Sequence, residues 1–377
     1  MRIETYSHTS SGWSREPDAA LDSERTLVVL FGPSGLIDSP GPAKRLFEAY
    51  PRSRIIGCSS SGEIHGTRIL DDSLTVAVAK FERVSLRLAS ARIGGPDDSF
   101  AAGRDIAGQL NAPDLRAVLV LSDGLLVNGS ALVRGVNSIL PPSVTVTGGL
   151  AGDGDRFKRT WVVAARKLAQ GVVSAVGLYG EALRMGHGSK GGWDAFGVER
   201  LVTRSKDNVL YELDGKPALQ LYKQYLGERA SGLPATGLLF PLTLRSGLGD
   251  EKRLVRTILA VDEAKQSMTF AGDIPQGYYA QLMCANFDRL IQGAGEAALS
   301  VGSRAGSAAP LSIAISCVGR RLVLGERAEE ETEAALEVLP PDTRQVGFYS
   351  YGEISPYASG HCDLHNQTMT LTTLSEA

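Results

Sequence analysis

Short apolar runs and helical stretches follow one another along much of the chain, and the same order recurs. Residues 26–31 are almost wholly apolar, and after a Gly/Pro loop come a helical pattern at 42–49 and a second apolar run at 54–58. The same order occurs at 117–147 and at 311–349. A strand, a helix and a strand within about 30 residues is the size of a parallel crossover. We therefore expect βαβ-like units, either as internal repeats or as independent examples of a common motif.

Short identical motifs link these units. Ser-x-Gly-Glu-Ile occurs at 60–64 and at 350–354, and Leu-Pro-Pro follows the helical stretch at 140–142 and at 339–341. Loops that follow parallel strands gather at one edge of a sheet, and glycine lets the backbone approach a ligand closely. We therefore expect the polar loops of the units to form one wall, or two related walls, of a pocket.

The C-terminal stretch 345–371 carries polar side chains where strands should bury apolar ones. Its second half, 364–371, alternates with a period of two, and Ser359-Gly360 permits a reversal that makes a hairpin. Its polar residues are Tyr351, Glu353, His365, Asn366 and Gln367. Because buried polar groups are costly unless they are paired, these groups either satisfy one another or bind a ligand.

The pattern predicts an α/β to α+β fold of two modules, with mixed β-sheets flanked by helices. The first 24 residues are polar, and we expect them to form a loosely held arm. A helix with an early proline follows Asp214-Gly215, so we place a boundary there and expect modules at 25–214 and 215–377.

Composition indicates a soluble cytoplasmic protein. Of the 377 residues 43% are hydrophobic and 21% charged, and a net charge of -3 gives no attraction to nucleic acid or anionic membranes. The four cysteines lie far apart without a CxxC pair, which favours a reducing compartment. The N-terminus lacks the apolar segment of a signal peptide, and the most apolar window, 117–127, is too short to cross a bilayer. We expect no membrane insertion.

Two glycine-containing loops could carry chemistry. Residues 57–62 lack the second glycine of a nucleophile elbow at Ser61, but Cys58 could act as a nucleophile if a base lies nearby. A hydrolase or transferase that depends on Cys58 is therefore one alternative, and a small buried residue beside a binding loop is the other. Residues 148–152 lack the Lys-Ser/Thr of a phosphate loop, so they form either a backbone-donor loop, next to Asp153, or a tight turn.

The histidines do not predict a zinc site. His361 and His365 are four residues apart, but on a strand that spacing spans about 13 Å, too far for one metal ion. One axial histidine would suffice for haem, and the candidates are His65, His187, His361 and His365. A hydrogen-bonded histidine without a ligand is the plainer interpretation.

Together these segments resemble the FIST family of sensory proteins. The N-terminal module of that family is similar to residues 55–64 and 147–153, and its C-terminal module to the chain from 213 onward, including 348–354 and 364–371. The resemblance implies that the chain senses small molecules, such as amino acids, and signals to partners that include histidine kinases, chemoreceptors and cyclic-di-GMP enzymes. One stand-alone bacterial branch is described as haem-binding nitric-oxide sensors. Without an F-box, kinase, receptor or cyclase segment, this chain is similar to the stand-alone form.

We therefore expect a cytoplasmic small-ligand sensor that signals through a separate partner protein and is not an enzyme. The alternatives are a haem-binding nitric-oxide sensor, the Cys58-dependent enzyme, and a scaffold whose polar strands satisfy each other. The residues expected to build the ligand pocket are Cys58, Ser59, Glu63, Gly149, Asp153, Tyr351, Glu353, His365, Asn366 and Gln367.

Overall fold

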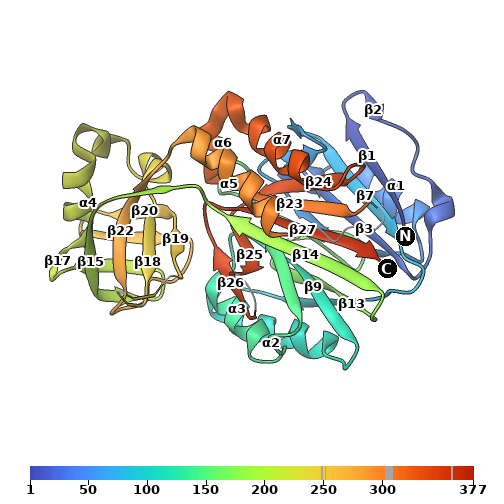
Figure 1. Cartoon of the computed structure of the whole chain (residues 1–377), viewed down its shortest axis with the longest axis horizontal. Coiled ribbons are helices and arrows are strands. Elements are labelled where there is room, and N and C mark those ends of the chain that lie inside the picture. The colour runs from blue at the N-terminus through green and yellow to red at the C-terminus, as the bar shows by residue number, and fades with distance from the viewer. Residues whose placement is uncertain (248, 251, 302–308, 358–359) are drawn as a thin grey trace.

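The chain forms a larger body of three mixed sheets and a smaller module built from its middle (Figure 1). The structure is a computed structural model, and it describes residues 1–247, 249–250, 252–301, 309–357 and 360–377. Ser359, expected at the C-terminal reversal, lies outside the described residues. This α+β architecture with mixed sheets confirms the predicted fold class.

Each sheet of the body is built on one parallel βαβ unit. The units are β3 (Thr26–Gly32), α1 (Gly41–Ala49) and β4 (Arg54–Ser59); β9 (Leu115–Ser122), α3 (Gly129–Asn137) and β10 (Thr145–Leu150); and β23 (Leu311–Cys317), α6 (Val318–Leu324), α7 (Ala328–Val338) and β24 (Arg344–Ser350). The three predicted crossovers are confirmed.

After its second parallel strand, every unit sends a hairpin to the sheet of another unit. The hairpins are β5 (Glu63–His65) with β6 (Arg68–Leu70), which joins β24; β11 (Val162–Ala164) with β12 (Lys167–Ala169), which joins β4; and β25 (Gly352–Pro356) with β26 (Cys362–His365), which joins β10. The chain then returns beside its own first strand as β7 (Leu74–Lys80), β13 (Val172–Tyr179) or β27 (Met369–Glu376). The units are therefore structural repeats that exchange hairpins in a cycle.

A further strand pairs with each returning strand, and the position of one of these strands contradicts the predicted N-terminal arm. These strands are β1 (Arg2–Thr9), β8 (Ser85–Arg92) and β14 (Leu183–Lys190). The first 24 residues are thus not a loosely held arm, because β1 pairs along β7 and buries Tyr6. Strand β1 lies near the end of its sheet, where only the short β2 (Gly12–Trp13) follows it. Because β1 is half exposed, it lacks the apolar run that would have identified it as a strand.

The smaller module is inserted into the third unit, between β14 and α5 (Phe287–Ser300). Its elements are β15 (Asp194–Lys206), β16 (Val209–Leu213), β17 (Lys216–Pro217), α4 (Ala218–Leu226), β18 (Leu242–Arg245), β19 (Leu254–Arg256), β20 (Ile258–Asp262), β21 (Ser267–Phe270) and β22 (Tyr279–Cys284). All its strand pairs are antiparallel among the described residues. The expected boundary at Asp214-Gly215 falls inside this sheet, and in space the inserted module extends from about residue 194 to about residue 284.

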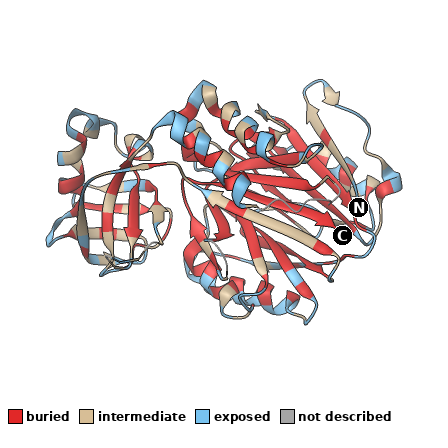
Figure 2. Ribbon diagram, viewed as in Figure 1, coloured by how far each residue is buried: buried red, intermediate tan, exposed pale blue. Residues whose placement is uncertain are grey.

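The body and the module have separate apolar cores (Figure 2). In the body the rings of Phe31 and Phe348 stack with centroids 4.6 Å apart and so join two sheets. The module buries Leu219 and Phe270 against its own strands. The remaining helices are α2 (Ser99–Leu110) and the 3-10 turns Ala19–Leu21, Ser34–Ile37, Pro96–Asp98, Gly227–Gly232, Ala235–Leu239 and Gly325–Arg327.

The repeats require glycine at one equivalent position. A Cβ atom at Gly57, Gly148 or Gly347 would lie far inside van der Waals contact with the carbonyl oxygen of the residue opposite on the first parallel strand. We expect Gly347→Ala to lower the free energy of unfolding by about 3 kcal/mol, the upper end of overpacking effects. Chemical denaturation measures the change.

The matched control is Gly108→Ala in α2, where nothing lies within 4 Å of the added Cβ. Because alanine is the better helix former, this variant should gain about 0.5–1 kcal/mol. A Gly347→Ala protein as stable as the wild type would show that β23 and β24 are not packed as described.

Candidate functional site

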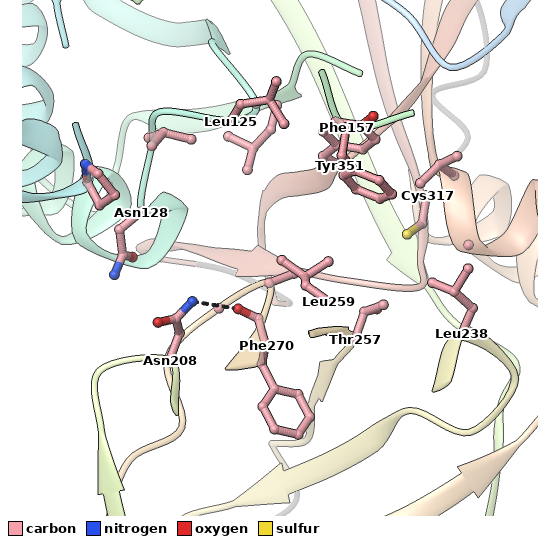
Figure 3. Close-up of a pocket in the computed structure, with 18 residues that line it drawn as sticks. Leu125, Asn128, Phe157, Asn208, Leu238, Thr257, Leu259, Phe270, Cys317 and Tyr351 are labelled. Atoms are coloured by element: carbon pink, nitrogen blue, oxygen red, sulfur yellow. Dashed lines mark hydrogen bonds between the residues drawn. The ribbon is translucent and has the colours of Figure 1, made fainter. Parts of the chain in front are cut away.

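A cavity of about 240 Å³ lies between the body and the inserted module (Figure 3). The labelled side chains of the body are Leu125, Asn128, Phe157, Cys317 and Tyr351, and those of the module are Asn208, Leu238, Thr257, Leu259 and Phe270. Ligand pockets generally have such apolar walls with a few polar groups. Because both parts of the chain contribute, a molecule in this cavity would contact both.

The aromatic wall of the cavity is held from behind by Asp153. Tyr351 follows β24, and its hydroxyl donates to the Asp153 carboxylate and accepts from the Asp153 N–H at 3.1 Å. The other carboxylate oxygen of Asp153 accepts from the N–H groups of Lys158 and Arg159, both at 2.9 Å, which shapes the loop that carries Phe157. The rings of Phe157 and Tyr351 stack with centroids 4.6 Å apart. Tyr351 therefore presents its ring to the cavity and directs its hydroxyl away.

The ionisable groups in the wall stay neutral. Burial, followed by the hydrogen bond to Asp153, raises the pKa of Tyr351 above its ordinary value. Burial, and next the charge of Glu353, also raises the pKa of the Cys317 thiol. No Asp, Glu, Lys, Arg or His belongs to the lining in the part of the chain that the structure describes. The cavity thus offers neutral hydrogen-bonding groups only.

The two asparagines of the wall already have partners. Asn128 donates from Nδ2 to Asp273 at 3.0 Å, and its Oδ1 accepts from the N–H of Ala131 at the start of α3. Asn208 donates to the Phe270 carbonyl at 2.7 Å. Thr257, between β19 and β20, differs from them, because its buried Oγ1 has no hydrogen-bond partner among the described residues.

The chain segments that enter and leave the module meet at a buried arginine. Arg320 Nη1 donates to the carbonyl of Gly191, before β15, and Nη2 donates to the carbonyl of Leu290, in the first turn of α5, at 2.8 Å. Its charge is balanced by Glu331, whose Oε2 lies 2.7 Å from Nη2, and both side chains are fully buried. Arg320 follows Val318 and Gly319, which line the cavity, on the same helix α6. The cavity and the attachment of the module are therefore one continuous structure.

Most of the residues expected to form the pocket lie elsewhere. Tyr351 lines the cavity, and Asp153 lies directly behind it. Cys58 and Ser59 are fully buried at the end of β4, where Ser59 Oγ accepts from the N–H of Trp161. A Cβ atom at Gly149 would meet side chains of the third sheet, so this glycine serves packing and is not a loop that binds an anion.

Glu63 and Glu353 have the same role in two repeats. Glu63 Oε2 accepts from the N–H and the hydroxyl of Ser73, both at 3.1 Å. Glu353 Oε2 accepts from the N–H of Thr368 at 3.2 Å and its hydroxyl at 2.9 Å, while Oε1 accepts from Ser350 at 2.6 Å. Each glutamate ties an exchanged hairpin to the strand that returns after it. The shared Ser-x-Gly-Glu-Ile motif therefore marks a structural contact.

The polar turn after β26 lies behind the cavity wall. His365 Nε2 bonds to the Ser355 carbonyl at 2.9 Å, and burial lowers the pKa of His365 to about 4. The Gln367 amide lies against Gly319, so closely that a Cβ there would overlap it. Neither amide atom of the fully buried Asn366 has a partner in the described part of the chain, yet Asn366 does not line the cavity. Of these three residues, Gln367 is nearest to the site.

Sequence reasoning missed the module side of the cavity. Thr257 and Leu259 lie in short segments with no distinctive motif, and only the docking of the module brings them to the body. Cys317 could have been found, since it ends the first parallel strand of the third unit, where ligands of parallel sheets commonly bind.

The residues of this site do not fit a haem. None of the histidines at 65, 187, 361 and 365 belongs to its described lining, and the raised pKa of Cys317 disfavours a thiolate ligand. No group of three or more His, Cys, Asp or Glu among the described residues is placed to hold a metal ion.

Comparison with known families decides the relationship. The model of the FIST N domain matches residues 26–216, and the model of the FIST C domain matches residues 218–356. The chain belongs to the FIST family. FIST domains are sensory ligand-binding domains of signalling proteins. In this FIST protein no helix of the described residues has the length and apolar character needed to span a bilayer.

Other known proteins add little. No curated protein matches the sequence. A solved structure with a similar course of the chain is cyanuric acid hydrolase from A. caulinodans, with 8% identity, a TM-score of 0.36, and coverage of 99% of this chain and 98% of that one. A likeness this distant carries no argument about activity.

Burial of Glu353 gives the protein a pH dependence that can be tested. Burial raises the pKa of Glu353 to about 8, although Ser350 and Thr368 donate to it. Between pH 4.5, the ordinary pKa of a glutamate, and about pH 8, the folded state binds the proton more tightly than the unfolded chain does. Stability therefore falls as the pH rises through this range. Glu353→Gln should remove a slope of up to about 1.4 kcal/mol per pH unit from denaturation curves recorded between pH 5 and 8.

Gln can keep the contacts of Glu353, because its amide oxygen can accept from Thr368 while the Ser350 hydroxyl turns to accept from the amide nitrogen. Glu337→Gln, an exposed glutamate on α7, is the control and should leave the profile unchanged. An unaltered slope in Glu353→Gln would contradict the assignment.

Removal of Arg320 should loosen the module. Arg320→Met leaves Glu331 buried without its cation, which costs about 3–5 kcal/mol. Arg327→Met, which breaks exposed pairs with Asp288 and Glu330, should change stability far less, because exposed ion pairs contribute little. Denaturation gives the energies, and limited proteolysis reports whether residues near 191 become accessible. Equal effects of the two variants would show that Arg320 does not hold these segments.

Proposed function

We propose that this FIST protein is a small-ligand sensor whose ligand binds in the cavity between the body and the inserted module. Binding changes how the two parts are held together, and a separate signalling protein, such as a histidine kinase or a chemotaxis or cyclic-di-GMP component, reads the change. The observation that carries the proposal is that both parts of the chain line one cavity. A ligand shifts a conformational equilibrium only when it contacts the two states differently, and a shared cavity meets this condition.

Helix α6 supplies the connection from the ligand to the rest of the molecule. Its first residues, Val318 and Gly319, touch the cavity, and Arg320 binds the segments on both sides of the module. A ligand that moves the start of α6 therefore also moves the carbonyl groups that fix the module.

The chain acts in this proposal without catalysis and in a reducing compartment such as the cytoplasm. All four cysteines are unpaired. Cys58 is fully buried, and burial raises the pKa of its thiol, so it has neither the access nor the thiolate that a nucleophile needs.

The test is a thermal-shift screen of wild type and two leucine variants against amino acids, neutral metabolites, haemin and nucleotides. Leu259, 41% exposed, points into the cavity in Figure 3, and Leu259→Trp should fill it. A ligand present at 100 times its Kd stabilises the wild type by about 2.7 kcal/mol, and this gain should vanish in Leu259→Trp.

The control is Leu201→Trp, which changes a leucine of similar exposure, 37%, on the same module but outside the cavity lining. It should respond to ligand as the wild type does. A compound that stabilises Leu259→Trp as strongly as the wild type would place the ligand elsewhere and overturn the proposal.

A further inference from the structure

The walls of the cavity are apolar on both sides. The body contributes Leu125, Val127 and Leu150, and the module contributes Leu259. Phe157 adds an aromatic face in stacking contact with Tyr351. Burial of apolar ligand surface against such walls is favourable by about 25 cal/mol per Å².

Charged groups near the cavity are already bound to other parts of the protein. Arg256 lies behind Gly272, but it donates to the carbonyl groups of Asp273 at 3.0 Å, Val255 at 3.0 Å and Leu364 at 3.1 Å. The Asp273 carboxylate is paired with Arg134. A carboxylate or ammonium group in the cavity would therefore lose its hydration without gaining a counter-charge, which costs several kcal/mol for each ion.

One polar group of the wall lacks a partner. Thr257 is 4% exposed, and its Oγ1 is buried and makes no hydrogen bond to any described residue. Because Thr257 lines the cavity through its other atoms, a change of its χ1 rotamer would be needed to turn the hydroxyl toward a ligand. A hydroxyl both donates and accepts, so a ligand carbonyl, hydroxyl or N–H would then satisfy it. The Cys317 sulfur, a weak donor, faces the same space (Figure 3).

The volume sets the size of the ligand. Engineered apolar cavities of about 150 Å³ bind benzene. A cavity of about 240 Å³ therefore accommodates one substituted ring or two fused rings.

We propose that the ligand is an uncharged, largely apolar molecule of this size, which forms a hydrogen bond with Thr257. This inference rests on the proposed function and refines it, because it excludes free amino acids, which carry two charges. Neutral aromatic compounds with one hydroxyl or N–H group belong to the favoured class.

The experiment compares neutral compounds with charged ones of the same ring. Indole is paired with L-tryptophan, and p-cresol with L-tyrosine, and binding to the full chain is measured by calorimetry and ligand-detected NMR. Indole and p-cresol should bind at least about tenfold more tightly than the amino acids, since each buried unpaired ion costs more than the 1.4 kcal/mol of a tenfold change.

Two threonine variants test the hydrogen bond. Thr257→Val removes the hydroxyl at nearly constant shape and should weaken binding of the neutral compounds about tenfold. The matched control is Thr243→Val on β18, because Thr243 is also buried with an unpartnered hydroxyl but does not line the cavity. It should bind both compounds as the wild type does.

Three results would overturn the inference. Amino acids that bind as tightly as their neutral counterparts would contradict the proposal that the ligand is uncharged. If Leu259→Trp then lost amino-acid binding, the cavity would still be supported as the ligand site. Equal binding by Thr257→Val and wild type would remove the threonine contact. Binding of neither indole nor p-cresol would reject this class of ligand, and the screen with Leu259→Trp would still decide the proposed function separately.

Discussion

The buried pair of Arg320 and Glu331 is the contact on which the arrangement of body and module depends. Here Arg320 binds the chain on both sides of the insertion, at the carbonyl group of Gly191 before it and at that of Leu290, in α5, after it. Glu331 balances the charge and also accepts from Ser316 at 2.9 Å and Tyr349 at 2.8 Å. Helices α6 and α7 and strands β23 and β24 thereby become part of the attachment. A buried ion pair of this kind stabilises little by itself, but its partners are costly to separate, so it fixes one geometry.

The cyclic exchange of hairpins explains why the same residues return along the chain without forming one site. Each repeat needs a close approach of its two parallel strands, and glycine occupies that position in all three, at 57, 148 and 347. Two repeats also use a buried glutamate to hold the exchanged hairpin. The repeat built on β23 and β24, which contains Glu353, differs from the other two because it carries the insertion, and the cavity forms where that insertion docks. The cavity, which is the proposed ligand site, therefore arises from the departure from symmetry, whereas the repeated motifs maintain the frame.

The sequence predicted the frame better than the site, for physical reasons that particular residues show. Apolar runs of β3, β9 and β23 are buried on both faces, and such runs are visible in one dimension. Strand β1 escaped notice because it is half exposed near the end of its sheet. The cavity combines Tyr351, which the sequence analysis selected, with Thr257 and Leu259, which no local pattern distinguishes. Contacts made only by docking of a separate module leave no signal in either segment alone.

A polar side chain within a strand is a poor indicator of ligand contact. Whether that side chain already has a hydrogen-bond partner is a better one. Glu63, Glu353 and His365 looked like ligand-binding groups because strands seldom bury such side chains, yet each has a partner within the fold. Thr257 is an ordinary residue by sequence, but it lines the cavity, and its buried hydroxyl has no partner among the described residues. Since an unpaired buried hydroxyl costs about 1–3 kcal/mol, a bound molecule that pairs with it recovers free energy that the folded chain alone cannot. The same reasoning disfavours charged ligands, because no counter-charge in the described wall could recover the cost of their dehydration.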